Sequence, residues 1–230
     1  MEKKRIVVTG SSRGIGRETV RFLLDRGHEV LALTRNDAAL EELSKTYSDL
    51  AVIAVDITTD EGLDGLVTFL SDRKLSLDGL VHNAGMLLNK PFEDTRVSDM
   101  MEVYKVNVFA VSELTRRLLP FFKKGAHVVG ISSMGGIQGS SKFPGLAAYS
   151  SSKAALITLF ELLAEEFKER GLSFNTLALG AVQTEMLEQA FPGYRASVTP
   201  GQMGAYVADF VLTGHELFNG KVLQVSNSTP

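Results

Sequence analysis

The chain contains no cysteine among its 230 residues, so disulfide bonds and thiol chemistry are excluded. Its four histidines, His28, His82, His127 and His215, are scattered and lack the spacing of a metal site. No apolar run is long enough to span a bilayer, and the run that follows the basic start "MEKKR" is too short for a signal-peptide core. We therefore expect no metal, no membrane association and a cytoplasmic location.

Neither sign of charge dominates, since 24 lysines and arginines face 27 aspartates and glutamates, for a net charge of −3. This balance disfavours a nucleic-acid partner or an anionic membrane surface. Hydrophobic residues make up 44% and charged residues 22%, as in ordinary globular domains. The sequence also lacks low-complexity linkers and obvious internal repeats, and we expect one domain over residues 1–230.

Short apolar, β-branched runs alternate with longer helical patterns. Strands are expected within 5–10, 29–34, 50–57, 77–85, 126–133, 172–180 and 221–226, and helices over 14–27, 37–47, 59–73, most of 98–122, about 147–170 and about 203–212. Continuous apolar strands separated by helices indicate a parallel sheet covered on both faces. The predicted fold is a doubly wound, Rossmann-type α/β domain with a mostly parallel sheet.

The first strand-to-helix turn reads "TGSSRGIG" and contains Gly10, Gly14 and Gly16. A dinucleotide site needs glycine in this turn so that the chain can bend sharply, approach the pyrophosphate and pack its helix on the strand. The amides at the helix N-terminus then face the phosphates. The alternative is an ordinary glycine-rich turn, but its place between the first strand and a helix favours the cofactor loop.

The second expected strand ends in "LTRND", with Arg35 where NAD-binding folds commonly place an acidic residue. Arg35 and Arg13, which lies in the glycine turn, suit a ribose 2′-phosphate and predict NADP(H), with NAD(H) less favoured. The alternative for Arg35 is a solvated loop cation. Asp37 fits a helix N-cap, although it could instead reach the ribose.

Two further strand ends point to the cofactor. Asp56 and Ile57, in "VDI", end the third strand, and the Asp56 carboxylate could accept a bond from the adenine amino group or simply form a turn. In "HNAG", the small residues after His82 would let the backbone, Asn83 to Gly85, pass close to the cofactor. His82 itself is expected to be a packed polar residue.

The motif "GISSMGG" ends the fifth strand with Ser132 and Ser133, and Tyr149 and Lys153 follow in "YSSSK". Four residues separate Tyr149 from Lys153, which places both side chains on one helix face. A free phenol has a pKa near 10 and is a poor catalyst at neutral pH. A neighbouring ammonium favours the phenolate, so we expect Lys153 to lower the pKa of Tyr149.

Together these motifs resemble those of the short-chain dehydrogenase/reductase family over essentially the whole chain. The glycine turn resembles its cofactor loop, "HNAG" its N-A-G motif, and "YSSSK" its active-site pair. The resemblance implies a catalytic tetrad of Asn107 in "VNVFA", Ser133, Tyr149 and Lys153, with Ser132 the less favoured serine. The cofactor residues that it implies are Gly10, Ser12, Arg13, Gly14, Ile15, Gly16, Arg35, Asp56, Ile57, Asn83, Ala84, Gly85, Tyr149, Lys153 and Thr184, the last one at the nicotinamide carboxamide.

The sequence departs from the family pattern at several places. Leu179 precedes Gly180 where the family often has proline, which predicts a more flexible backbone there. The interval from Ser133 to Tyr149 is longer than usual and predicts an extended loop around "SSKFPG". A short substrate lid is expected over 185–200, and "VSNSTP" replaces the more frequent ending. Five residues could line an apolar substrate pocket or merely pack in loops: Met134, Phe143, Met186, Phe191 and Tyr194.

These features predict an NADP(H)-dependent carbonyl reductase that acts on a small-molecule carbonyl or alcohol. The cofactor half would span about 1–130 and the catalytic and substrate half about 131–230. The alternative is a non-catalytic, cofactor-sensing protein on the same fold, which would usually lack the tyrosine or lysine. The apolar helix from Ala147 to Arg170 predicts a homo-oligomer, because one stripe packs on the sheet and the rest needs a partner. The resemblance to the family implies a tetramer rather than a dimer.

Overall fold

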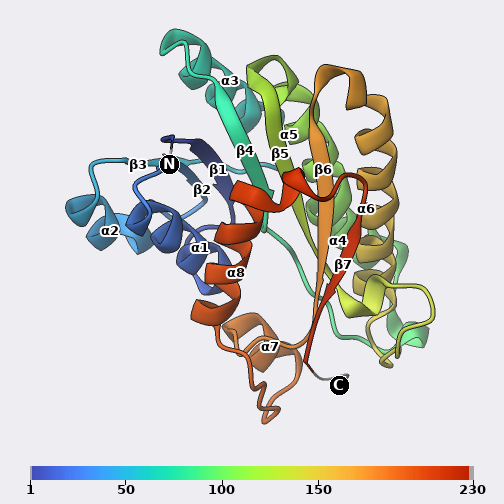
Figure 1. Ribbon diagram of the computed structural model, residues 1–230. Coiled ribbons are helices and arrows are strands. Elements are labelled where there is room, and N and C mark those ends of the chain that lie inside the picture. Colours follow the sequence, from blue (N-terminus) through green and yellow to red (C-terminus); the bar gives the residue numbers. More distant parts are fainter. Residues whose placement is uncertain (1, 228–230) are drawn as a thin grey trace.

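Seven parallel strands form one sheet in the computed structural model, which describes residues 2–227 (Figure 1). The strand order is β3-β2-β1-β4-β5-β6-β7, so the chain reverses direction across the sheet between β1 and β4. The strands are β1 Arg5–Thr9, β2 Glu29–Thr34, β3 Leu50–Ala54, β4 Leu77–His82, β5 Phe122–Ser133, β6 Ser173–Leu179 and β7 Val222–Val225. The crevice at such a reversal is where doubly wound sheets bind ligands.

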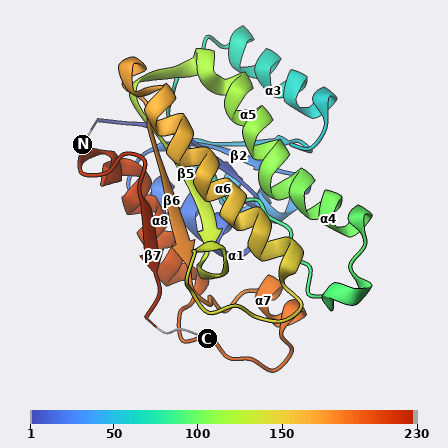
Figure 2. The same cartoon turned by 90° about the vertical axis from the view of Figure 1, so that its right-hand side faces the viewer.

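Helices cover both faces of the sheet, as the run of apolar strands predicts (Figure 2). One core cluster joins the sheet to α3, α5 and α6, and the other joins it to α1 and α8. The helices are α1 Gly14–Asp25, α2 Glu41–Thr46, α3 Asp60–Asp72, α4 Val97–Tyr104, α5 Ala110–Leu118, α6 Ala147–Glu166, α7 Glu185–Ala190 and α8 Pro200–Thr213. The doubly wound α/β fold is confirmed.

Several boundaries differ from the sequence prediction. The expected third strand ends early, at Ala54, because its partner β2 ends at Thr34 and the two residues form the last pair. Asp56 and Ile57 therefore lie in the turn after β3. The fifth strand begins earlier than expected, at Phe122, which pairs with Leu77.

The prediction that Asp37 caps a continuous helix is wrong. Residues Asp37–Leu40 form a 3₁₀ turn, and the separate helix α2 begins only at Glu41. Asp37 is the first residue inside the 3₁₀ turn, and Asn36 occupies the cap position without a side-chain cap bond. The helical segment before β5 also contains an unexpected π-turn, Lys105–Phe109, between α4 and α5.

Leu179, which stands in place of the family's proline, is held on both sides by neighbouring strands. It pairs with Ser133 of β5 and with Val225 of β7. The next residue, Gly180, donates its amide hydrogen to the Val225 carbonyl at 3.0 Å, and a Cβ on Gly180 would come within 2.2 Å of Ser226 Oγ. The end of β7 thus packs tightly against this backbone. The last three residues of "VSNSTP" lie outside the described residues.

Within residues 2–227 no helix is long and apolar enough to cross a membrane, and no cluster of histidine, aspartate and glutamate side chains could hold a metal ion.

Candidate active site

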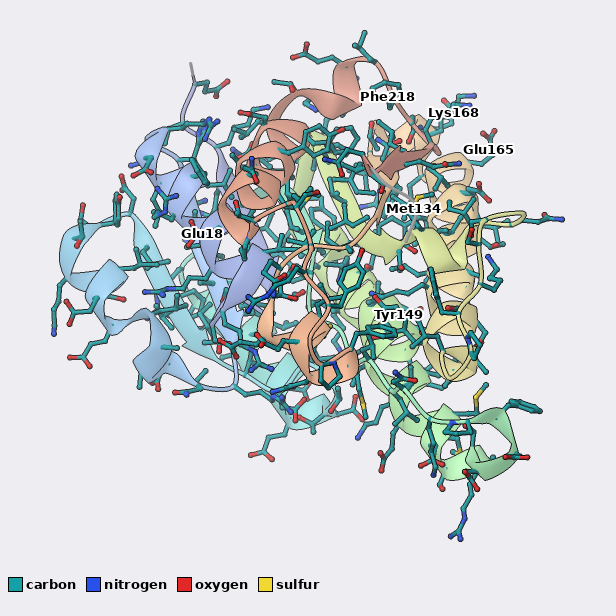
Figure 3. All side chains as sticks on the ribbon, turned by 90° about the horizontal axis from the view of Figure 1, so that it is seen from below. Glu18, Met134, Tyr149, Glu165, Lys168 and Phe218 are labelled. Carbon is teal, nitrogen blue, oxygen red and sulfur yellow. The ribbon has the colours of Figure 1, made fainter. Side chains whose placement is uncertain are left out.

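A cavity of about 1200 Å³ opens at the carboxyl ends of the central strands. Figure 3 shows the molecule from below, with the labelled side chains of Tyr149 and Met134 both to the right of the centre of the view. The cavity brings together nearly all the predicted site residues. Those that line it are Gly10, Ser12, Arg13, Gly14, Ile15, Arg35, Asp56, Ile57, Asn83, Ala84, Gly85, Ser133, Tyr149, Lys153 and Thr184. Gly16 and Asn107 are buried behind its wall.

The glycine turn leaves a backbone cradle between β1 and α1 that side chains would fill. Gly10 and Gly14 have φ angles of 64° and 55°, in the left-handed region that favours glycine. A Cβ on Gly10 would approach Ala84 Cα to 2.8 Å, and one on Gly16 would approach the Gly10 carbonyl oxygen to 2.3 Å. This bare backbone, opening directly into the N-terminus of α1, fits the pyrophosphate of a dinucleotide.

Thr9 clamps the N-A-G turn to this cradle, and sequence reasoning missed it. Its hydroxyl oxygen accepts hydrogen bonds from the amides of Asn83 and Ala84, each at 3.0 Å. Asn83 Nδ2 in turn donates to the carbonyl oxygens of Thr9 and Gly10, at 3.1 and 3.0 Å. The sequence feature that could have pointed to Thr9 is a polar residue at the end of an otherwise apolar strand, directly before Gly10.

The two arginines predicted at the ribose occupy different environments. Arg35 is exposed and directly follows β2 at the cavity edge. Arg13 forms an ion pair with Glu185, the first residue of α7, at 2.5 Å between Nη1 and Oε2. Both partners of that pair are more than half exposed, so the pair is weak and Arg13 can exchange its partner for another anion. Glu185 was not singled out by the sequence.

Asp56 forms the turn that was one of its two readings, and it also lines the cavity. Its Oδ1 accepts hydrogen bonds from the amide and the hydroxyl of Thr58, at 2.9 and 2.7 Å. The hydrogen bond from the Thr58 amide is the main reason why the pKa of Asp56 is lowered, and the charge of Arg35 contributes. Its adenine contact stays a prediction.

Ser133, Tyr149 and Lys153 meet where the end of β5 faces the first turns of α6. The Ser133 hydroxyl lies close enough to the Tyr149 phenol to lower its pKa, and Ser133 Oγ also accepts the Gly135 amide at 3.2 Å. Lys153 Nζ lies 5.7 Å from the centre of the Tyr149 ring and donates to the Ile131 carbonyl oxygen at 2.8 Å. The helical spacing therefore places the phenol and the ammonium on one face, as predicted.

The expectation that the pKa of Tyr149 lies below its ordinary value is wrong for the protein alone. Burial raises the pKa of Tyr149 to about 12, with the Ser133 hydrogen bond acting in the opposite direction. Burial also lowers the pKa of Lys153 to about 8. Both shifts have the same cause, because taking a charged form out of water is unfavourable. Tyr149 is thus a protonated phenol at neutral pH, suited to donate a proton.

Asn107 lies in the π-turn and is fully buried, with its side chain fixed from three sides. Its Oδ1 accepts the Met86 amide at 2.8 Å, and its Nδ2 donates to the Met86 carbonyl oxygen and to Ser152 Oγ, each at 2.9 Å. A Cβ on Gly85 would lie 3.4 Å from both Asn107 Oδ1 and Lys153 Nζ. Gly85 therefore lies directly beside both Asn107 and Lys153.

The two serines at the end of β5 have different environments. Ser132 is buried, and its hydroxyl donates to the Lys153 carbonyl oxygen at 2.9 Å. Ser133 instead reaches Tyr149. Both serines line the cavity, but the Ser132 hydroxyl is held by the backbone of α6, and the choice of Ser133 as the catalytic serine stays a prediction.

The expected lid over 185–200 contains the unpredicted helix α7, followed by a loop. Thr184 caps α7 by accepting the Leu187 amide at 3.2 Å, and it lies against Gly14 across the cavity. Val182 and Val198 form an isolated bridge, which closes the base of this excursion. Five predicted pocket residues all line the cavity: Met134, Phe143, Met186, Phe191 and Tyr194.

His82 is a packed core residue, as expected. It is buried, its Nε2 lies 2.9 Å from Thr115 Oγ1, and its ring packs edge-on against Phe160. Burial lowers the pKa of His82 to about 3, so the ring is neutral.

The fold and the arrangement of Ser133, Tyr149, Lys153 and the glycine cradle together define a dehydrogenase or reductase of the doubly wound α/β type.

Comparisons with known proteins agree with this class. A family model described as short chain dehydrogenase matches residues 4–195, and the chain belongs to that family. The rhamnolipids-biosynthesis 3-oxoacyl-(acyl-carrier-protein) reductase of Pseudomonas aeruginosa is 31% identical over 213 residues, which cover 86% of this chain and 82% of that protein.

Two solved structures are similar over nearly the whole chain. Pseudomonas aeruginosa RhlG in an active-site complex with NADP is 27% identical with a TM-score of 0.86, covering 98% of this chain and 96% of that one. A 4-hydroxyisoleucine dehydrogenase complexed with NADH is 25% identical with a TM-score of 0.87, covering 98% of each chain. The similarity therefore extends to relatives with either nicotinamide cofactor.

Proposed function

We propose that this protein is an NADP(H)-dependent reductase of a small-molecule carbonyl compound, which also oxidises the corresponding alcohol. The observation that supports this most is that Ser133, Tyr149 and Lys153 lie together at the wall of a cavity that also contains the glycine cradle, with Lys153 Nζ 5.7 Å from the centre of the Tyr149 ring. The similar reductase and dehydrogenase of known structure support a nicotinamide cofactor.

The residues of the cradle fit the cofactor because bare backbone surrounds the predicted pyrophosphate position. Gly10, Ser12, Gly14 and Ile15 would hold the phosphates, and the turn from Asn83 to Gly85 would pass beside the cofactor. Asp56 and Ile57 would contact the adenine, Thr184 the carboxamide, and Lys153 the nicotinamide ribose. When bound, the nicotinamide supplies or accepts the hydride.

The protein's own part in reduction is to hold and protonate the substrate oxygen. Ser133 would donate a hydrogen bond to that oxygen, and the protonated Tyr149 would transfer its phenolic proton to it. Lys153 would stabilise the phenolate that remains, and Asn107 would connect the lysine to a water chain that returns the proton. Tyr149 with its pKa of about 12 begins this sequence in the required protonated form.

The preference for NADP(H) is proposed from the two arginines at the ribose end. Arg35 lies beside the cavity next to Asp56, and Arg13 is held only by an exposed ion pair. A 2′-phosphate carries a charge that NAD(H) lacks, and each hydrogen bond to a charged group contributes about 1.5–3 kcal/mol before solvent screening. Arg35→Ala should raise the KM for NADPH and leave the KM for NADH nearly unchanged. A wild-type protein that prefers NADH would refute this reading.

Oxidation of NADPH by a panel of ketones, aldehydes and diketones tests the proposed activity. Turnover of any member above the rate without substrate supports a reductase. Tight NADPH binding without turnover of any carbonyl or alcohol would instead indicate a cofactor-sensing protein. The cytoplasmic location and the homo-oligomeric state stay predictions.

A further inference from the structure

Beside Ser133 and Tyr149, the cavity wall is largely apolar and is built by side chains from separate segments, and Gln189 of α7 adds one uncharged polar group. Met86 and Leu87 follow the N-A-G turn, Met134 follows β5, and Phe143 lies in the loop before α6. Met186 and Phe191 add the lid. Methionine side chains are flexible and polarizable, so such a wall adapts to apolar groups of different shape.

The charged residues that line the cavity are on its cofactor side or already have partners. Arg35 and Asp56 lie at the ends of β2 and β3, and Glu185 pairs with Arg13. Lys153 is buried beneath Tyr149, where its ammonium is held by the Ile131 carbonyl oxygen. Among the lining residues, these five are the charged ones.

Three cations near the apolar wall, Lys90, Lys142 and Arg195, do not line the cavity. Lys90 pairs with Asp99 at 2.7 Å, and Lys142 Nζ donates to the Ile137 carbonyl oxygen and to Ser140 Oγ, at 2.5 and 2.7 Å. Arg195, next to Tyr194, is exposed and does not line the cavity. Within residues 2–227, therefore, the lining of this part of the cavity contains no unpaired cation that could neutralise a substrate carboxylate.

We propose that the substrate is a carbonyl compound whose remaining part is apolar and uncharged inside the cavity, such as a medium-chain ketone, and that compounds with a carboxylate there are excluded. A carboxylate that leaves water for an apolar wall without a cationic partner is strongly disfavoured, whereas an alkyl group gains from the same transfer. This inference rests on the proposed function, because it assigns the apolar wall to the substrate of that reaction.

A matched pair of ketones tests this charge selection. 7-Oxooctanoate differs from 2-octanone only in carrying a carboxylate in place of the terminal methyl group. Calorimetric or ligand-observed NMR titrations, with and without NADP⁺, should show that 2-octanone binds about tenfold more tightly or better. Equal binding of the two ketones, or tighter binding of 7-oxooctanoate, would overturn the proposal.

A charge placed in the wall should weaken the preference for 2-octanone. Met186→Lys puts an ammonium on the half-buried face of α7 and should shift the ratio of the two affinities toward 7-oxooctanoate by about tenfold. Ser71→Lys is the matched control, since it adds the same charge at an exposed position near the end of α3, where the chain leads into the amino end of β4. An unchanged ratio in a folded Met186→Lys protein would contradict the assignment of this wall.

Turnover of the same two ketones separates this inference from the proposed function. Selective binding of 2-octanone without oxidation of NADPH or NADH would support the apolar site and refute the reductase. Reduction of both ketones with equal kcat/KM and equal affinity would support the reductase and refute the charge selection.

Discussion

At the scale of single residues, burial determines the protonation states at the site. Lys153 is buried and Tyr149 is half-buried at the cavity wall, and removal from water disfavours the charged form of each. The pKa of Tyr149 is raised to about 12 while that of Lys153 falls to about 8. The spacing in the sequence predicted the pair correctly, but it could not predict the direction of the tyrosine shift. Desolvation depends on side chains that come from distant parts of the chain.

The lysine shift predicts the pH dependence of carbonyl reduction. Below a pKa of about 8, Lys153 is an ammonium that can stabilise the tyrosine phenolate, and above it that charge is lost. Tyr149 stays protonated throughout, because its pKa is about 12. The kcat for reduction at saturating substrate, measured from pH 6 to 10, should be constant at low pH and fall above about pH 8. A rate that rises through that range would contradict the role given to Lys153.

Ser152 is expected to act as a positioning residue for Asn107. Its hydroxyl donates to the Tyr149 carbonyl oxygen at 2.7 Å and accepts from Asn107 Nδ2 at 2.9 Å. Ser152→Ala should lower kcat by up to about tenfold and leave the KM values nearly unchanged, since one neutral hydrogen bond contributes about 0.5–1.5 kcal/mol.

Ser151→Ala is the matched control, because the Ser151 hydroxyl donates to the carbonyl oxygens of Ala147 and Ala148 in its own helix. Equal kcat losses in both variants, measured by steady-state kinetics, would mean that Ser152 merely supports α6.

At the scale of secondary-structure elements, apolar periodicity predicted most strands and helices, because the sheet buries its strands on both faces. It failed where a neighbouring element decides the outcome. The strand β3 stops at Ala54 because β2 offers no further partner beyond Thr34. Helix α7 has six residues and turns Met186 and Leu187 toward the cavity, so its pattern is too short to recognise. The π-turn at Asn107 likewise leaves no periodic signal of its own.

The helix α6 carries the prediction of a homo-oligomer. The fold accounts for much of its apolar surface, since Leu156 and Phe160 are buried and Leu159 and Leu163 pack against the core. Leu162 remains 63% exposed, and exposed apolar side chains also occur at Met101 and Phe109 of the neighbouring segments. Light scattering should show a mass above the 25.0 kDa of one chain. A single-chain mass that persists at high protein concentration would contradict this expectation.

At the scale of the whole molecule, buried neutral histidines couple stability to pH. Burial lowers the pKa of both His82 and His127 to about 3, below the ordinary value of 6.5. The unfolded chain therefore binds protons that the folded chain does not as the pH falls below 6.5. The contribution of these histidines to the free energy of unfolding is fully present above pH 6.5. It is lost progressively toward pH 3, by roughly 1 kcal/mol per pH unit for each histidine.

Urea unfolding at pH 7, 6 and 5 measures this coupling. His82→Gln should reduce the slope of the unfolding free energy against pH by the contribution of about one bound proton. This holds whatever the effect of the substitution on stability at pH 7. Between pH 5 and 6.5 the carboxylates are largely ionised in both states, so histidines dominate the change. An unchanged slope in the variant would mean that His82 is protonated inside the folded protein.

The account as a whole depends on the phenolic proton of Tyr149. Tyr149→Phe removes the hydroxyl and keeps the ring that packs at the start of α6, so the fold and NADPH binding should persist. Turnover of a ketone that the wild-type protein reduces should fall by about 10²–10⁴-fold, which is the usual contribution of general acid catalysis. Steady-state kinetics, together with NADPH titration of the same preparation, measures both quantities. Intact NADPH binding with this loss of kcat is the predicted result, and wild-type turnover in the variant would contradict the proposed mechanism.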